Sequence, residues 1–125
     1  ISEHDQILSL TSHLPHVIAY NIVKTSMSNS EKVKKDIVRY SAGGLRDFTR
    51  IAASDPIMWK DIFIDNSESI ITAIDNFVKN LTEFKNAIKE KDSKKLLDIF
   101  EKSKEFRDEI IKAGQDTDKP DFGRK

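Results

Sequence analysis

The sequence predicts an all-helical fold, because its apolar residues recur every three or four positions over most of its 125 residues. The alternation of apolar and polar residues that marks a half-buried strand is not sustained over any useful length. Aspartate, proline and glycine also stand where helices are expected to begin or end. The charged fraction, 34% against 38% hydrophobic residues, suits long amphipathic helices with wide solvated faces.

The first helix is expected from Glu3 to Met27, with Ser2 as its N-cap. Pro15 lies in the middle of this stretch. Because proline has no N–H and leaves the carbonyl of Thr11 without its helical donor, we expect a kink there. A polar stretch follows, and then a shorter helix is expected over 31–40.

Gly43 and Gly44 lead into another short helix, expected from about Leu45 to Ala53. A clear restart signal comes next. Asp55 is the expected N-cap, because its carboxylate can accept from backbone N–H groups of the first turn. Proline at the first helical position is well tolerated, so the following helix is expected over 56–64.

The last two helices have the most regular apolar pattern. Asn66 is the expected N-cap of a long helix whose apolar positions continue to Ile88. Asp92 is the expected N-cap of the final helix, and Gly114 suits the position just past its end. Residues 115–125 are polar and are expected to form a flexible tail.

Composition excludes several classes of function. Lysines plus arginines number 21 and aspartates plus glutamates also 21, so a general affinity for nucleic acid or an anionic membrane has no support. No cysteine is present, which excludes disulfides and thiolate chemistry and makes the cytoplasm the simplest location. No apolar run approaches the ~20 residues that span a bilayer.

The length suits one domain. Two long terminal helices offer more apolar surface than a domain of this size covers by itself, so we expect a homodimer. The chain begins with Ile1 rather than methionine, and we expect it to be part of a longer protein.

The stretch from Gly43 to Ala52 is the first candidate binding site. Arg46 and Arg50 are four residues apart and share one face of the expected helix. A glycine pair allows close approach of backbone or ligand, and a helix N-terminus favours an anion, so a carboxylate or phosphate would fit. The alternative is that Arg50 forms a surface ion pair with Asp47 or Asp55, which would contribute little.

His13 and His16 form the second candidate, one helical turn apart around Pro15. They could contact an anionic substrate, or they could be partly buried and bonded to nearby carbonyls. A zinc site would need a third ligand, and only His4 or a carboxylate is available. Trp59, the single tryptophan, is either a packing residue or one wall of a ligand pocket.

No convincing catalytic set of nucleophile, base and acid is present. The glycine pair has neither a strand before it nor a third glycine after it, so the dinucleotide-binding fingerprint is missing. The lysine-rich stretch 89–95 is interleaved with acids and is interpreted as a solvated helix face.

Three sequence blocks stand out together: LTSHLPH at 10–16, GGLRDFTRIA at 43–52 and SDPIMWKDIF at 54–63. In these residues the chain resembles the C-terminal helical domain of prephenate dehydrogenases and the related arogenate and cyclohexadienyl dehydrogenases. The order and spacing of the blocks match, and they cover the chain from about His4 to Asn66. The helices that follow match only in type.

The resemblance implies that residues 1–114 are a dimerisation and substrate-binding domain of five to six helices, ending in two long amphipathic helices. This fold would be like the C-terminal domain of 6-phosphogluconate dehydrogenase. A Rossmann domain, absent from this chain, would precede it and bind NAD or NADP. The whole enzyme would oxidatively decarboxylate prephenate or arogenate, both small dicarboxylates, in tyrosine biosynthesis. The fragment would then lack a catalytic residue and be inactive.

The resemblance also implies roles for particular residues. His16 would contact substrate and Arg50 would be the main carboxylate binder, while Arg46 would reach the site from the dimer partner. The glycines would allow close backbone approach, and Asp47 and Trp59 would line the site or its entrance. The expected substrate-binding residues are His13, His16, Gly43, Gly44, Arg46, Asp47, Arg50 and Trp59. The alternative function is a stand-alone, dimeric helical interaction module without catalysis.

Overall fold

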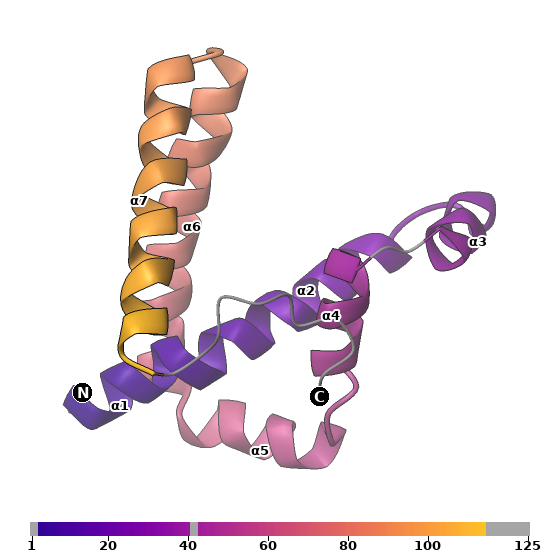
Figure 1. Ribbon diagram of the computed structural model, residues 1–125. Helices are drawn as coiled ribbons and strands as arrows, with labels where there is room; N and C mark the ends of the chain where they lie inside the picture. The colour runs from indigo at the N-terminus through magenta and orange to yellow at the C-terminus, as the bar shows by residue number, and fades with distance from the viewer. Residues whose placement is uncertain (1–2, 41–42, 115–125) are drawn as a thin grey trace. The chain divides into compact units, whose positions relative to one another are not determined.

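The computed structural model describes residues 3–40 and 43–114, and all regular structure in these ranges is helical (Figure 1). The prediction of an all-helical fold is therefore confirmed. The expected N-cap Ser2 and the expected tail 115–125 lie outside the described residues. The elements are α1 (Glu3–Leu8), the π-helical turn η1 (Ser9–His13), α2 (Leu14–Met27), α3 (Glu31–Arg39), α4 (Gly43–Ile51), α5 (Pro56–Asp65), α6 (Ser67–Lys89) and α7 (Ser93–Lys112).

The long first helix is interrupted, as expected, but upstream of the proline. The N–H of Leu14 donates to the carbonyl of Ser9, an i→i+5 bond that widens the turn. Pro15 then occupies the first turn of α2, where its missing N–H costs least. The predicted disturbance of the helix is present, but it takes the form of a π-helical turn that ends before Pro15 and presents His13 at its last position.

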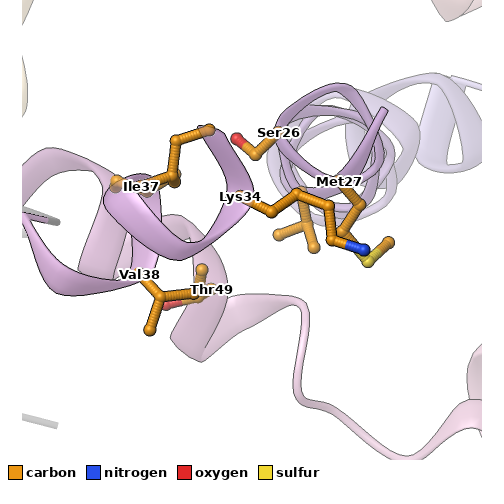
Figure 2. Close-up of a pocket in the computed structure, with 8 residues that line it drawn as sticks. Ser26, Met27, Lys34, Ile37, Val38 and Thr49 are labelled. Atoms are coloured by element: carbon orange, nitrogen blue, oxygen red, sulfur yellow. The ribbon is translucent and has the colours of Figure 1, made fainter. Parts of the chain in front are cut away.

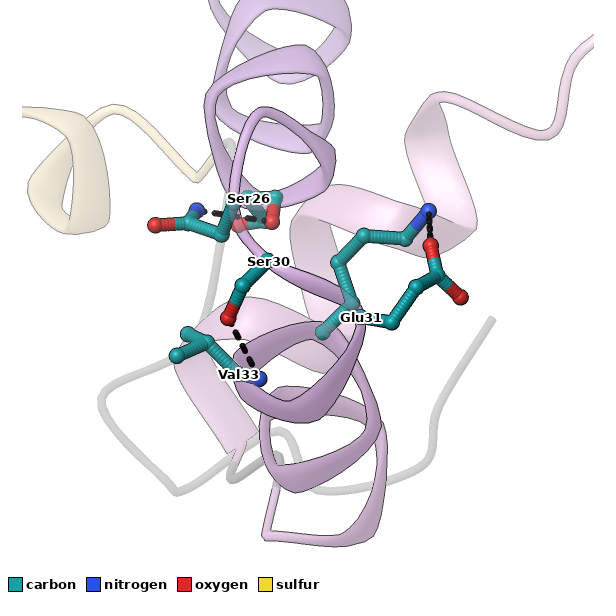
Figure 3. A network of polar contacts seen from close by, with 6 residues as sticks. Ser26, Ser30, Glu31 and Val33 are labelled. Atoms are coloured by element: carbon teal, nitrogen blue, oxygen red, sulfur yellow. Dashed lines mark hydrogen bonds and ion pairs between the residues drawn. The ribbon is translucent and has the colours of Figure 1, made fainter.

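Among the described residues, side-chain caps mark the starts of α3, α5 and α7. The Oγ of Ser30 accepts from the N–H of Val33 at the start of α3 (Figure 3). As expected, the carboxylate of Asp55 accepts from the N–H groups of the first turn of α5, and that of Asp92 accepts from Lys95 N–H in α7. Each cap satisfies a donor that the helix itself leaves unpaired, which fixes where the helix starts.

Asn66 stands at the N-cap position of α6, as expected, since α6 begins at Ser67, but its side chain serves the helix before it. Its backbone carbonyl accepts from Ile70 N–H, as an N-cap carbonyl does, but its amide Nδ2 donates back to the carbonyl of Ile62 at 2.8 Å. The side chain therefore closes the end of α5. Gly114 behaves as expected: its φ is +80°, and its N–H donates to the carbonyl of Ile111.

The chain divides into two compact units, residues 1–77 and 78–125. In the first unit α2 contacts both α3 and α4, and its aromatic residues meet those of α5. Small residues allow this close packing: Ala19 and Ala73 are buried, and so are Ser9 and Ser69, whose hydroxyls donate to carbonyls of the preceding turn.

The second unit is a helical hairpin formed by the end of α6 and by α7 (Figure 1). Ala87 is buried, and the rings of Phe84 and Phe100 meet edge to face with centroids 6.1 Å apart. Apolar side chains nevertheless remain about half exposed along both helices, namely Val78, Leu81, Ile88, Leu97, Phe100 and Phe106. No described helix is long and apolar enough to cross a membrane.

Candidate functional site

The candidate site is built around a stacked pair of rings, His16 from α2 and Trp59 from α5. Their centroids are 3.6 Å apart and their planes are inclined by 18°. Trp59 lies in the first turn of α5, one turn after the Asp55 cap that fixes the start of that helix, and is 8% exposed. The structure therefore brings together two of the predicted site residues, and it shows that Trp59 is a packing residue that also forms one side of the histidine environment.

His13 contacts the same tryptophan from another direction. Its ring meets Trp59 edge-on, with centroids 6.1 Å apart and planes at 83°. The side chain is buried, and its Nδ1 has no hydrogen-bond partner. Burial lowers the pKa of His13 below its ordinary value; the nearby His16 lowers it further, and Asp5 opposes the shift. Burial therefore favours the neutral form of the His13 imidazole.

The hydrogen bond of His16 fixes its tautomer. Its Nδ1 lies 3.0 Å from the carbonyl oxygen of Ser12. A carbonyl can only accept, so Nδ1 carries the proton and donates it. In the neutral ring Nε2 is then an acceptor, and it becomes a donor only when the ring is protonated. Of the two alternatives for the histidine pair, carbonyl bonding describes His16, whereas His13 lacks such a partner at Nδ1.

Two further aromatic residues belong to the same cluster and were missed by the sequence analysis. The ring of Tyr20 lies 6.3 Å from that of His16 and meets Phe63 edge to face, and Phe63 in turn packs against Trp59. The Oη of Tyr20 is buried and has no hydrogen-bond partner. The signal that could have found them is spacing, because each aromatic residue lies four positions after a predicted site residue and so shares its helix face.

The predicted anion-binding residues lie on α4. Arg46, Asp47 and Arg50 are all exposed. A guanidinium nitrogen of Arg50 lies 3.9 Å from a carboxylate oxygen of Asp47, too far for a hydrogen bond, and the side chains are 56% and 71% exposed. Of the two carboxylates considered as partners for Arg50, Asp47 is the one that forms this pair. It is a loose surface pair, and it leaves the guanidinium accessible to a ligand.

The glycine pair lies inside α4, which begins at Gly43 and ends at Ile51 rather than running from Leu45 to Ala53 as expected. A Cβ built at Gly43 or Gly44 would meet no described atom within 4 Å. The packing of the described chain therefore does not explain these glycines. If the two glycines are needed because another group comes close to the backbone there, that group is not among the described residues.

A separate cavity of about 290 Å³ lies between α2, α3 and α4 (Figure 2). It is mainly aliphatic, and the Lys34 side chain extends across it toward Met27. None of the predicted site residues lines it. Its lining residues are Val23, Ser26, Met27, Lys34, Ile37, Val38, Leu45 and Thr49.

The remaining contacts of the site define its limits. Within residues 3–40 and 43–114, no hydrogen bond, ion pair or ring contact joins the α4 residues to the His16–Trp59 stack. The same ranges contain no group of three or more histidine, cysteine, aspartate or glutamate residues that could hold a metal ion. The arrangement thus offers two separate anion-compatible groups, an imidazole on an indole face and an exposed guanidinium.

An all-helical chain with a thin core, apolar faces left exposed and no complete catalytic set is typical of a helical domain that associates with another chain or domain. The comparison with protein families makes this specific. Residues 1–102 match the family "Prephenate dehydrogenase, dimerization domain", and the chain belongs to that family.

Individual relatives agree. The chain is 42% identical over 104 residues to a cyclohexadienyl dehydrogenase of Zymomonas mobilis, covering 83% of this chain and 36% of that protein. It is 35% identical over 106 residues to a prephenate dehydrogenase of Bacillus subtilis, covering 85% and 28%. Among solved structures, the chain resembles prephenate dehydrogenase from A. aeolicus in complex with hydroxyphenyl propionate and NAD+. The TM-score is 0.78 at 41% identity, and the match covers 86% of this chain and 37% of that chain. The chain thus spans about a third of the length of these relatives.

Proposed function

We propose that this chain is the C-terminal helical part of an NAD(P)-dependent prephenate or arogenate dehydrogenase, and that it supplies dimerisation and substrate carboxylate binding. The observation that carries the proposal is the stack of His16 on buried Trp59 within a chain of the prephenate dehydrogenase dimerization family. In such an enzyme the substrate would be a small dicarboxylate of tyrosine biosynthesis. A cytoplasmic location is proposed with it, and the cysteine-free sequence is compatible with that.

Arg50 is the residue we assign to the main carboxylate contact. A guanidinium can bind a carboxylate through two parallel hydrogen bonds, which orients the ligand as well as attracting it. Its present partner Asp47 is 3.9 Å away and both side chains are well exposed, so a ligand would compete with a weak interaction. Each charge-assisted hydrogen bond of this kind contributes about 1.5–3 kcal/mol.

The other predicted residues would complete this site. His16 and Trp59 would form one wall, with His13 behind the indole. Arg46 would reach the site of the dimer partner, and Asp47 would line its entrance. The open space beside Gly43 and Gly44 supports close approach of a ligand or a partner backbone at the start of α4.

The redox chemistry is assigned to the part of the protein outside this chain. The A. aeolicus relative is described in complex with NAD+, and this chain covers 37% of it. We propose that a nucleotide-binding domain supplies NAD or NADP and the catalytic histidine. Hydride would pass from the ring carbinol carbon to the nicotinamide as carbon dioxide leaves. The isolated chain would then bind no dinucleotide and show no turnover.

The proposed homodimer is supported by the exposed apolar faces and by the family description. Half-exposed leucine, isoleucine and phenylalanine side chains along α6 and α7 are what a second copy would cover. The alternative, a stand-alone helical interaction module, uses the same faces but no substrate.

The two functions are separated by an assay of the full-length protein. Formation of reduced nicotinamide is measured spectroscopically with prephenate or arogenate as substrate and NAD or NADP as cofactor. Turnover with one of these pairs supports the proposal, and the chain alone should give none. If the pure, folded full-length protein turns over none of them, the dehydrogenase assignment is wrong and the interaction module is favoured.

A further inference from the structure

We propose that binding of a carboxylate ligand at the His16–Trp59 stack is coupled to the uptake of one proton by His16. The inference rests on the proposed function for the presence of such a ligand, but its evidence is the geometry of the ring. It assigns to the site a chemical condition, a protonated imidazole, that family membership does not specify.

The first step is the fixed tautomer. Nδ1 of His16 donates to the carbonyl of Ser12 at 3.0 Å, so in the neutral ring the lone pair is on Nε2. A carboxylate is also an acceptor, and two acceptors facing each other repel. His16 can therefore donate from Nε2 to a carboxylate only as an imidazolium, with Nδ1–H still bonded to Ser12.

The second step is the position of the charge. The ring of His16 lies on the face of Trp59, with centroids 3.6 Å apart, and the negative face of an indole attracts a cation. His16 is only partly buried, so its cationic form keeps access to solvent or ligand. A positive charge on this ring would therefore lie against the indole face, on a side chain that solvent or a ligand can reach.

The third step excludes His13 as the site of proton uptake. It is 5% exposed, and its Nδ1 has no acceptor for a proton. Burial and the neighbouring His16 both lower the pKa of His13. Because two cations on adjacent turns repel, a proton that enters this pair goes to His16.

The charged residues around His16 do not change the conclusion that its ring must be protonated to donate from Nε2. On α1, Asp5 acts on His13. On α5, Lys60 and Asp61 pair with each other at 3.5 Å, and the ring that faces the histidines is the uncharged Trp59. The other charged residues of α2 and of the helices packed around it fall into two groups. On α1, α2 and α5 they are Glu3, Lys24, Asp65 and the cap Asp55; on α3 and α4 they are Glu31, Lys32, Lys34, Lys35, Asp36, Arg39, Arg46, Asp47 and Arg50. Glu31 pairs with Lys34, and Asp47 pairs with Arg50.

The consequence is a defined pH dependence. Where the unliganded ring is neutral, each ligand bound takes up one proton, and the association constant falls about tenfold per pH unit as pH rises. Where the ring is already protonated, ligand binding takes up no proton and the association constant does not change with pH. Arginine contributes no such slope, because it stays protonated throughout.

The test is calorimetric, on the full-length protein, with hydroxyphenyl propionate as the probe. Binding enthalpies are measured in buffers of different ionisation enthalpy at about pH 8, above the ordinary histidine pKa, and the slope gives the protons taken up per ligand. The wild type is expected to take up about one proton more than His16→Gln. His4→Gln, which alters an exposed histidine of α1, is the matched control and should keep the wild-type value.

Trp59→Phe provides a second variant in case His16→Gln perturbs the fold. A phenyl face attracts a cation less than an indole face does, so at that pH this variant should bind the probe several-fold more weakly than the wild type while still taking up about one proton per ligand. Equal proton uptake in the wild type and a folded His16→Gln variant, with binding intact, overturns the inference alone. Failure of the wild type to bind the probe at all overturns both this inference and the proposed substrate site.

Discussion

Replacing Arg50 with alanine should raise the KM for the dicarboxylate substrate strongly while leaving nicotinamide cofactor affinity nearly unchanged. The reason is that, in the function we propose, the cofactor binds to a part of the protein outside this chain. Arg50 lies on the surface of α4, half exposed, with a guanidinium placed to meet a ligand from solvent.

The magnitude follows from what the side chain does and does not contact. Its pair with Asp47 is 3.9 Å long and exposed, so breaking it should change the free energy of unfolding by well under about 1 kcal/mol. Loss of one charge-assisted bond to a carboxylate costs about 1.5–3 kcal/mol, and each 1.4 kcal/mol is about a factor of ten. We therefore expect a ten- to hundred-fold rise in KM, roughly, with little change in Tm.

Steady-state kinetics of the full-length enzyme, with substrate varied at saturating cofactor and then the reverse, measures both constants. Arg50→Lys should recover part of the loss, since it keeps the charge but not the bidentate geometry. Arg39→Ala is the matched control: it removes an exposed arginine of α3 that lies over Tyr40. An unchanged substrate KM in Arg50→Ala would refute the carboxylate role. So would an equal rise in the Arg39 variant.

Three further predictions test the hairpin and the histidine cluster. Asp92→Ala removes the cap of α7 and should lower the free energy of unfolding, measured by urea titration, by about 1 kcal/mol. The control Asp98→Ala breaks only the exposed pair with Lys102 and should change that free energy little, so equal effects of the two variants would argue against the cap. Phe100→Glu places a charge on the exposed apolar face of α7 and should convert a dimer to monomers, as measured by sedimentation equilibrium. The control Lys94→Glu changes an exposed polar position of the same helix and should leave the dimer intact, and a dimer that persists in Phe100→Glu would exclude this face from the interface. Because the pKa of His13 is lowered in the folded state, the unfolded chain binds more protons, and the free energy of unfolding should fall as pH drops below about 6.5. Urea midpoints measured at several pH values should show this fall in the wild type and a flatter profile in His13→Phe. The same profile in both proteins would contradict the lowered pKa of the buried His13.

The starts of α5 and α7 could be predicted because their causes are local, whereas α4 begins and ends two residues earlier than expected. The Asp55 and Asp92 caps, the proline after the first cap and the positive φ of Gly114 each depend on residues within one turn. The prediction was less accurate where one side chain could bond to either of two neighbouring helices. Asn66 can serve the helix before it or the one after it, and its amide bonds to Ile62.

The candidate site could be predicted only as separate motifs. The histidine pair, the α4 arginines and Trp59 were all found in the sequence, but their mutual arrangement was not. Tyr20 and Phe63 were missed because an aromatic residue on a helix face predicts burial without naming its partner.

The sequence by itself determined the helical class, most of the caps and the candidate residues, since hydrogen bonds within a turn and the helical period act over a few positions. Only the tertiary structure decided that His16 stacks on Trp59, that His13 is buried with an unpaired Nδ1, and that Ser12 holds the proton of His16 on Nδ1. The physical reason is that ring contacts between α2 and α5, and the burial they cause, depend on how two helices distant in the chain pack against each other.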